Sequence, residues 1–281
     1  MRNKNPGYNL NWKSVWREMR GQRMRPVKIK FDPAFKEKFA KNYSERAESN
    51  DYEYGRKAIK ALSEILEENF KVLEIGPGPG TLTIPLAKMV KRIVVVEASK
   101  LAVGHLLKNL AKSGVNNVEV INENWEKINL KDNFDLVICS HFLWQMKDIE
   151  TLLKKMEIAS NRYCAVIQPA GRESIIKEAW KKMTGEDYKG QFEPDADHFV
   201  YLILRQWGKL VNVRVMEYNI ERNLGQEIRY IASFVGKCKK IDRDAEKFIR
   251  KFLIGESENG IFKARHSAVV MWWRPDGRYT T

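Results

Sequence analysis

Cysteine is scarce in this sequence, and long apolar runs are absent. Its 281 residues include three cysteines, Cys139, Cys164 and Cys238, which are too few and too scattered for a disulfide framework. Two of them fall in apolar runs typical of strands, so we expect reduced core residues. No apolar run approaches the roughly 18 residues that a membrane span needs. The first residues also lack the apolar stretch of a secretory signal, and we therefore expect a cytoplasmic protein without a membrane partner.

Closely spaced pairs of His, Cys or acidic residues, which would indicate a metal site, are also missing. We therefore expect no bound metal. Hydrophobic residues make up 43% of the chain and charged residues 31%, as in ordinary globular proteins. A chain of this length can bury a large core, and we expect one domain with extensions.

Positive charge is abundant and unevenly distributed. The net charge is +14, and residues 1–47 carry thirteen Lys or Arg against four acidic residues. Basic side chains bind nucleic acid by neutralising phosphates and releasing counterions. An RNA-binding segment and a solvated basic segment that lies over the protein surface both explain this distribution.

The basic segment has the periodicity of helices. Trp12, Val15, Trp16 and Met19 recur at helical spacing within residues 11–20, which predicts an amphipathic helix packed on the body. Further helices are expected at 33–48 and 52–69. Residues 1–50 are thus predicted to form a basic helical N-terminal arm.

Apolar runs typical of β-strands alternate with helical segments from residue 71 onward. The expected strands are 71–75, 93–96, 118–121, 134–139 and 163–167, and the expected helices are 82–90, 100–113 and 149–160. Such alternation predicts a doubly wound α/β sheet of mainly parallel strands covered on both faces. The remaining chain predicts helices at 172–183, 198–208, 226–235 and 243–253 and strands at 210–220 and 261–273.

A glycine-rich turn follows the first of these strands. Gly76, Gly78 and Gly80 occupy alternate positions where the strand gives way to a helix. Glycine permits unusual dihedral angles and leaves no side chain between the backbone and a ligand. The next strand ends at Glu97, where a carboxylate can accept hydrogen bonds from both hydroxyls of a ribose. Together the turn and this acid predict a site for a nucleoside-containing cofactor.

Residues 71–169 resemble the core of the class I, Rossmann-like S-adenosylmethionine-dependent methyltransferases. The segment Glu74-Ile75-Gly76-Pro77-Gly78-Pro79-Gly80 matches the first motif of that family, and Glu97 matches its ribose-binding acid. The resemblance implies S-adenosylmethionine as the cofactor, with the glycines bordering its methionine and ribose parts. It also implies that Glu74 orders the amino group, directly or through water.

The same resemblance suggests three more cofactor contacts. Asn124 stands where the family usually has an aspartate beside the adenine, and its amide oxygen can accept from the adenine amino group. Trp125 either covers the adenine face or fills the core. Tyr43 belongs to Tyr43-Ser44-Glu45-Arg46-Ala47, which resembles an aromatic-x-x-Arg-Ala pattern that helps close the cofactor site in small-molecule methyltransferases. An amphipathic helix with inward apolar residues is the alternative.

The reaction zone of a doubly wound sheet lies beyond the carboxyl ends of its strands. Ser140 and His141 follow the fourth parallel strand and should face the methyl group, with Gln168 beside them on the fifth. A histidine with a pKa near neutrality suits removal of the acceptor proton. His141 is therefore the candidate general base, and a positioning role is the alternative.

The resemblance implies a methyltransferase domain over residues 51–281 built on a seven-stranded sheet with an antiparallel last strand. Its cofactor core would be 71–169, with a substrate-side helical cover at about 170–209 and 221–257. Methylases of base amino groups carry an Asn or Asp before a Pro-Pro-aromatic or Leu-Pro-aromatic sequence, whereas this chain has Ser140-His141-Phe142-Leu143. We therefore expect a small-molecule acceptor. An rRNA or tRNA substrate and a non-catalytic cofactor-binding role are the alternatives, and the sequence does not indicate the oligomeric state.

Overall fold

A computed structural model describes residues 10–25, 33–130, 133–170, 174–188, 196–236 and 238–275. Parts of the predicted arm, 1–9 and 26–32, lie outside these ranges. So do residues 171–173 and 189–195 of the predicted substrate-side cover.

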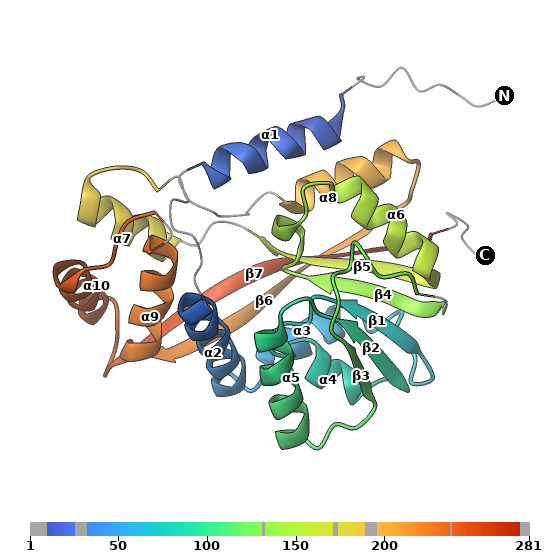
Figure 1. Cartoon of the computed structure of the whole chain (residues 1–281), viewed down its shortest axis with the longest axis horizontal. Coiled ribbons are helices and arrows are strands. Elements are labelled where there is room, and N and C mark those ends of the chain that lie inside the picture. Colours follow the sequence, from blue (N-terminus) through green and yellow to red (C-terminus); the bar gives the residue numbers. More distant parts are fainter. Residues whose placement is uncertain are drawn as a thin grey trace.

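Within the described residues, the fold is organised around one sheet of seven strands (Figure 1). The strands are β1 (Lys71–Ile75), β2 (Arg92–Val96), β3 (Val118–Ile121), β4 (Phe134–Ser140), β5 (Ser160–Ala170), β6 (Asn212–Asn223) and β7 (Ile261–Trp273). Their order is β3-β2-β1-β4-β5-β7-β6. Strands β1 to β5 pair in parallel, and β7 is antiparallel to both β5 and β6. The predicted doubly wound sheet with an antiparallel last strand is confirmed.

Apolar residues on both sides of the central strands explain why helices cover both faces. One face packs against α3 (Glu53–Ala61), α4 (Thr83–Ala87) and α5 (Lys100–Lys112), and the other against α1 (Trp12–Met24), α6 (Ile149–Ala159) and α8 (Ala196–Gln206). Successive strand residues point to opposite faces. Leu73 and Val137 therefore enter the core under α6 and α8, while Val72 and Leu136 enter the core under α3 and α4.

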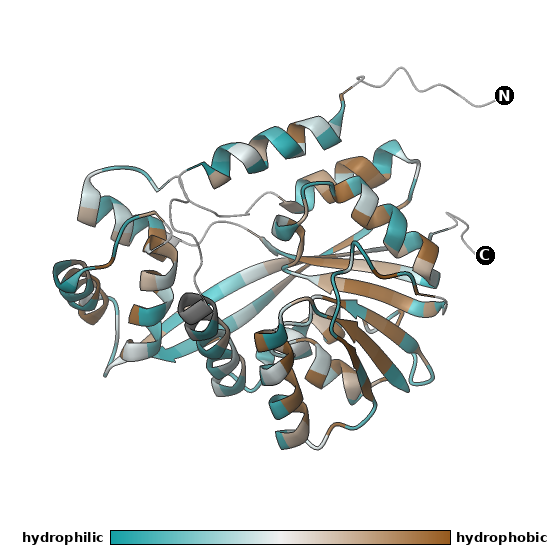
Figure 2. Cartoon of the chain, viewed as in Figure 1, coloured by the Kyte–Doolittle hydropathy of each residue, from teal (hydrophilic) through white to brown (hydrophobic). Residues whose placement is uncertain are grey.

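A third apolar cluster lies beside the far ends of β6 and β7. There α7 (Ser174–Thr184), α9 (Leu224–Val235) and α10 (Arg243–Gly255) pack together around Ile231, Ile249 and Phe262. In Figure 1 these helices gather at one end of the long β6–β7 pair, and α2 (Pro33–Ser49) runs between them and α5. Figure 2 shows apolar colouring concentrated in the central strands.

The helix α1 is fastened to the chain that follows β4. The indole Nε1 of Trp16 donates to the carbonyl of Met146 at 3.1 Å, and Nε of Arg20 donates to the carbonyl of Trp144 at 2.9 Å. Trp16 is 1% exposed, so the predicted packing of this helix on the body is confirmed. Trp144 lies within the 3₁₀ turn Leu143–Gln145 and Met146 directly follows it, so α1 holds this turn at both carbonyls.

Two helices are shorter than their periodicity predicts. Helix α3 ends at Ala61 instead of residue 69, since Glu64, Glu67 and Glu68 follow and acidic side chains are unfavourable at a helix C-terminus. Helix α4 spans only five residues. Strand β5 is longer than expected, because β7 pairs with it as far as Ala170. Among the described helices, none is long and apolar enough to cross a membrane.

Candidate active site

The glycine-rich turn between β1 and α4 has a backbone that favours glycine at three positions. Gly76, Gly78 and Gly80 have φ values of 67°, 56° and 93°, in the left-handed region that other residues rarely adopt. A Cβ atom on Gly76 would lie 2.4 Å from Cδ2 of Phe142, and one on Gly78 would lie 3.6 Å from Cε1 of Tyr43. The turn is therefore bordered by two aromatic rings.

Glu97 lies at the edge of this turn, as predicted from the sequence. Its carboxylate accepts hydrogen bonds from the backbone N–H of Gly78 at 3.3 Å and of Ser99 at 2.8 Å. Burial raises the pKa of Glu97, and the backbone donors oppose that shift. The carboxylate is thus fixed next to the turn, with oxygen lone pairs left for further donors.

Glu74 is more deeply buried than Glu97. It is 1% exposed and accepts a hydrogen bond of 2.7 Å from Oγ1 of Thr83. Burial raises the pKa of Glu74 to about 7, with a smaller contribution from the negative charge of Glu97. A cationic amino group nearby would stabilise the ionised form of this carboxyl.

The turn and its two acids fit a nucleoside-containing sulfonium cofactor. A turn without side chains lets a ligand lie against the backbone, and Glu97 supplies a paired acceptor for hydroxyls. Buried Glu74 supplies a carboxyl group with a raised pKa, and a cation bound beside it would favour its ionised form. The residues predicted to hold S-adenosylmethionine therefore have the chemistry that this cofactor needs.

Asn124 and Trp125 lie in the turn after β3. The side-chain oxygen of Asn124 accepts from the backbone N–H of Glu126 at 2.8 Å. Trp125 is 3% exposed and belongs to the core cluster under α6 and α8. Nζ of Lys155 donates to the carbonyl of Ile128 at 2.5 Å and also to that of Trp125. The structure thus places Trp125 in the core, and any contact of either residue with adenine remains a prediction.

Helix α2 holds the outer side of the glycine-rich turn. Nδ2 of Asn109 on α5 donates to Oγ of Ser44 at 2.8 Å and to the carbonyl of Pro79 at 2.9 Å. Both Ser44 and Asn109 are buried. This link keeps Tyr43 against Gly78, and sequence reasoning did not identify Asn109 because a lone amide within a helix gives no signal.

The carboxyl end of β4 forms the inner side of the site. Oγ of Ser140 and the phenol of Tyr54 share a hydrogen bond of 2.7 Å. His141 has a φ of 51° and donates its backbone N–H to the carbonyl of Ile167 at 3.0 Å. Its ring meets Tyr54 edge to face, with centroids 5.1 Å apart. Ser140 and His141 are brought together at this edge, and Tyr54 is a residue that sequence reasoning missed.

The imidazole of His141 is neutral at pH 7. Burial, with a contribution from the positive charge of Arg46, lowers the pKa of His141 to about 4, below the near-neutral value expected from sequence. Its Nε2 atom is buried without a hydrogen-bond partner among the described residues. The same is true of both amide atoms of Gln168, which is 0% exposed. Because buried polar groups are normally satisfied, these atoms are suited to contact a ligand.

Two residues of the β6–β7 pair extend this aromatic lining. Tyr218 lies edge to face with Tyr54 at 5.1 Å between centroids, and His266 lies 5.8 Å from Tyr218. Tyr218 and His266 are directly paired across the two strands. Their segments are distant from Ser140 in sequence, so periodicity alone could not join them to the site. Among the described residues, no group of three His, Cys, Asp or Glu side chains is arranged to hold a metal.

The sheet order and the glycine-rich turn define an α/β fold with a Rossmann-like cofactor site. Residues 72–159 match a family described as a methyltransferase domain. The matched segment contains the glycine-rich turn and strands β2 to β4, so this part of the chain is similar to a methyltransferase domain, and the sheet around it has a Rossmann-like order.

Three known proteins illustrate the similarity. A ribosomal RNA small subunit methyltransferase A of Desulforapulum autotrophicum is 34% identical over 101 residues, which cover 32% of this chain and 36% of that protein. A crystal structure of a candidate methyltransferase from Bacillus halodurans has a TM-score of 0.52 at 12% identity and covers 78% of this chain and 99% of that one. A candidate S-adenosylmethionine-dependent methyltransferase of Methanococcus maripaludis has a TM-score of 0.52 at 20% identity, with coverage of 66% and 90%.

These similarities differ in what they cover. The match to the ribosomal RNA enzyme spans only about a third of that relative, 36%. The two solved structures extend the likeness of fold over most of this chain. The fold is therefore established over most of the chain, while the activity and the acceptor must be argued from the site.

Proposed function

We propose that this chain is an S-adenosylmethionine-dependent methyltransferase that acts on a small-molecule acceptor. The observation that carries the proposal is the enclosed polar site at the carboxyl ends of β4 and β5. There Nε2 of His141 and the amide of Gln168 are buried without partners among the described residues, and Tyr54 and Tyr218 line the adjacent wall. Such a combination of convergent polar groups and aromatic walls is typical of small-molecule sites.

The cofactor would be held by residues at the carboxyl ends of β1 and β2. Gly76, Gly78 and Gly80 would border it, Glu97 would accept from its ribose hydroxyls and Glu74 would face its amino group. Asn124, Trp125 and Tyr43 are the further proposed contacts. When bound, S-adenosylmethionine supplies an electrophilic methyl group on a sulfonium sulfur.

The chain's own residues would align the acceptor and accept its proton where that proton must leave. A neutral His141 has a lone pair on one ring nitrogen, and its Nε2 is buried without a hydrogen-bond partner among the described residues. Ser140 is fixed by Tyr54 and retains capacity for another hydrogen bond. Methyl transfer requires alignment of the two reacting atoms above all, so His141 and Ser140 are proposed to orient the acceptor, with His141 also serving as base.

An RNA acceptor is the second candidate. It is supported by the name of the ribosomal RNA relative and by the basic charge of residues 1–47. The sequence after β4 argues against an RNA acceptor. Phe142 packs over Gly76 there, and the Pro-Pro-aromatic sequence that binds a flipped base is missing. A small acceptor is therefore favoured, and the helical segments within 170–209 and 221–257 are proposed to cover it.

A labelling experiment separates these candidates. Purified full-length chain is incubated with S-adenosylmethionine carrying a tritiated methyl group and either a small-molecule extract passed through a filter or total RNA. We expect label in the small-molecule fraction, no transfer to RNA above background, and strongly reduced label in the small-molecule fraction with His141→Asn protein. Label in RNA alone would overturn the choice of acceptor. Cofactor binding without transfer to any fraction would favour the non-catalytic role.

The basic arm can be tested without removing the buried Trp16. Arg17, Arg23 and Arg25 on or next to α1 have exposed or half-buried side chains. Replacement of all three by Gln removes their charge without placing an acid beside Asp148, which Arg17 contacts. An RNA-binding arm would lose retention on heparin and RNA at moderate salt. Unchanged retention would indicate that another surface, or no specific surface, binds the polyanion.

A further inference from the structure

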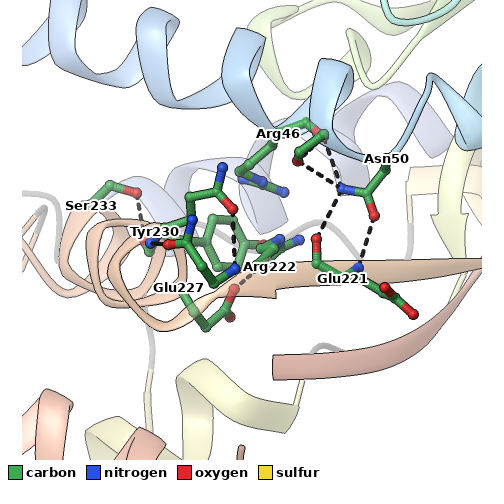
Figure 3. Close-up of polar contacts among 10 residues, drawn as sticks. Arg46, Asn50, Glu221, Arg222, Glu227, Tyr230 and Ser233 are labelled. Atoms are coloured by element: carbon green, nitrogen blue, oxygen red, sulfur yellow. Dashed lines mark hydrogen bonds and ion pairs between the residues drawn. The ribbon is translucent and has the colours of Figure 1, made fainter. Parts of the chain in front are cut away.

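A second polar cluster lies next to the proposed acceptor site, at the corner between β6 and α9. Arg46 of α2 and Arg222 of β6 both stack on the ring of Tyr230, with guanidinium carbons 4.0 and 4.3 Å from its centroid. Figure 3 shows Arg46 directed from α2 toward Tyr230 and Arg222. None of these residues was predicted from the sequence to bind the acceptor.

The two arginines differ in their carboxylate partners. Arg222 is 2% exposed and forms an ion pair with fully buried Glu227, with Nη1 and Oε2 2.5 Å apart. Arg46 has no ion pair with a carboxylate of the described residues, and its Nε atom is buried without a hydrogen bond there. Its neighbour Glu45 pairs with Arg229 instead. Among the described residues, Arg46 is therefore the arginine of this cluster without a carboxylate partner.

Arg46 is also close to the proposed reaction zone. Burial lowers the pKa of His141, which directly follows β4, and the charge of Arg46 adds to that shift. The pKa of His266 on β7 is lowered by burial, by Arg222 and also by Arg46. Tyr43, three residues earlier on the same helix, faces Gly78 of the cofactor turn. Arg46 thus stands between the cofactor turn and the β6–α9 corner.

Several contacts keep Arg46 at this place. Asn50, directly after α2, donates to the carbonyl of Glu221 at 3.2 Å and accepts from its N–H at 2.8 Å (Figure 3). Nε of Arg229 on α9 donates to Oδ1 of Asn42 at 3.0 Å. Helix α2 is thereby tied to both β6 and α9, so the guanidinium is held in position before any ligand binds.

We propose that the methyl acceptor carries a carboxylate, which Arg46 binds while the aromatic rings of Tyr54, Tyr218 and Tyr230 contact its apolar body. An arginine fork matches a carboxylate geometrically, and a partly buried cation without a counter-charge is costly until an anion joins it. His141 and His266 are uncharged at pH 7 and therefore add no net charge beside the anion. This assignment of the substrate class rests on the proposed methyltransferase function.

Binding of matched acid and amide pairs to the full-length chain tests this assignment. The probes are benzoate, 4-hydroxybenzoate and 4-aminobenzoate, each with its primary amide, titrated by calorimetry or ligand-observed NMR at saturating S-adenosylhomocysteine. We expect at least one acid to bind roughly 10-fold or more tightly than its amide, the range of a charge-assisted hydrogen bond. Arg46→Gln should abolish that preference, and Arg46→Lys should retain part of it. Arg56→Gln, at an exposed arginine of α3 paired with Asp51, is the control and should change nothing.

The outcomes that overturn the assignment are distinct. Equal affinity for acids and amides, no binding of any acid, or a preference that survives in Arg46→Gln would each contradict it. Weaker S-adenosylhomocysteine binding by Arg46→Gln, with unchanged binding of decarboxylated S-adenosylmethionine, would assign Arg46 to the cofactor's own carboxylate instead. If Arg46→Gln does not fold, two measurements replace it. They are the preference of the wild type for acids over amides, and the loss or retention of that preference in Arg46→Lys. Failure of the wild type to bind S-adenosylhomocysteine would contradict the proposed function itself. Binding of S-adenosylhomocysteine without a preference for acids over amides would contradict only this inference.

Discussion

Tyr54 and Ser140 are joined by a hydrogen bond of 2.7 Å between a phenol on α3 and a hydroxyl at the end of β4. Burial raises the pKa of Tyr54 well above 10, so this phenol stays protonated. The same ring contacts both His141 and Tyr218. Tyr54 therefore fixes the proposed reacting edge from one side, although it is absent from every motif that the sequence displays.

Tyr54→Phe should preserve the ring contacts and remove only this hydrogen bond. We expect a loss of about 1 kcal/mol in the free energy of unfolding, the usual size for one hydrogen bond. Methyl transfer should fall, while binding of S-adenosylhomocysteine should stay within about twofold of wild type. Tyr201→Phe is a matched control, because Tyr201 is 40% exposed on α8. A Tyr54→Phe protein that loses cofactor affinity but not turnover would contradict the assignment.

Gly76→Ala should damage the cofactor site more than an ordinary glycine substitution does. The new Cβ would lie 2.4 Å from Cδ2 of Phe142, and φ at Gly76 is 67°. Gly114→Ala is the control, since Gly114 has a φ of 65° with no atom within 4 Å of the added Cβ. Both should lose about 1 kcal/mol from backbone strain, and thermal unfolding measures this loss.

Only Gly76→Ala should also displace Phe142 and weaken cofactor binding in a calorimetric titration. Equal effects of the two substitutions on binding would remove Phe142 from the proposed site.

His141→Asn tests the role of the imidazole without straining the backbone, since Asn tolerates positive φ. If His141 takes the acceptor proton, turnover should fall by about 10² to 10⁴, with cofactor affinity unchanged. Wild-type turnover should be independent of pH above about 6 and should decline as pH falls toward the His141 pKa of about 4. A fall of only about tenfold with an unchanged pH profile would indicate a positioning residue.

The stability of the protein should also depend on the protonation of His141. The folded-state pKa of about 4 lies below the roughly 6.5 of an unfolded histidine. His141 therefore contributes stability that is fully present above pH 6.5 and is lost as pH falls through about 4, because the unfolded chain binds the proton first. Urea unfolding at pH 7 and pH 5 should show a smaller difference for His141→Asn than for wild type. An identical difference would place the imidazole in contact with solvent.

The sequence predicted the fold well, because its strands are short apolar runs separated by helical periodicity. Strand β1 and strand β7 have the predicted limits, and the glycine turn lies where the pattern placed it. Helix ends were less predictable. Helix α3 stops at Ala61 although its apolar pattern continues, since unfavourable charge after the helix outweighs periodicity.

The residues of the candidate site were predictable only where a polar side chain lies at the end of a strand or directly after it. Glu97 directly follows β2, and Ser140 and His141 lie at the end of β4 and directly after it. The parallel sheet therefore brings these residues to one edge. Tyr54, Phe142, Tyr218 and His266 arrive from helices, turns and the β6–β7 pair, and only the folded chain reveals their contacts. Likewise Arg46 was visible as part of a motif, but its stacking on Tyr230 depends on a residue far along the chain.

The most direct test of this account is calorimetric titration of S-adenosylhomocysteine into wild type, Glu97→Ala and His141→Asn. We predict that wild type binds and that Glu97→Ala weakens binding by roughly 10-fold to 100-fold, the range for hydrogen bonds to a charged group. His141→Asn should bind as wild type does. A wild-type chain that binds neither S-adenosylhomocysteine nor S-adenosylmethionine, or a Glu97→Ala protein with unchanged affinity beside a weakened His141→Asn protein, would contradict the account.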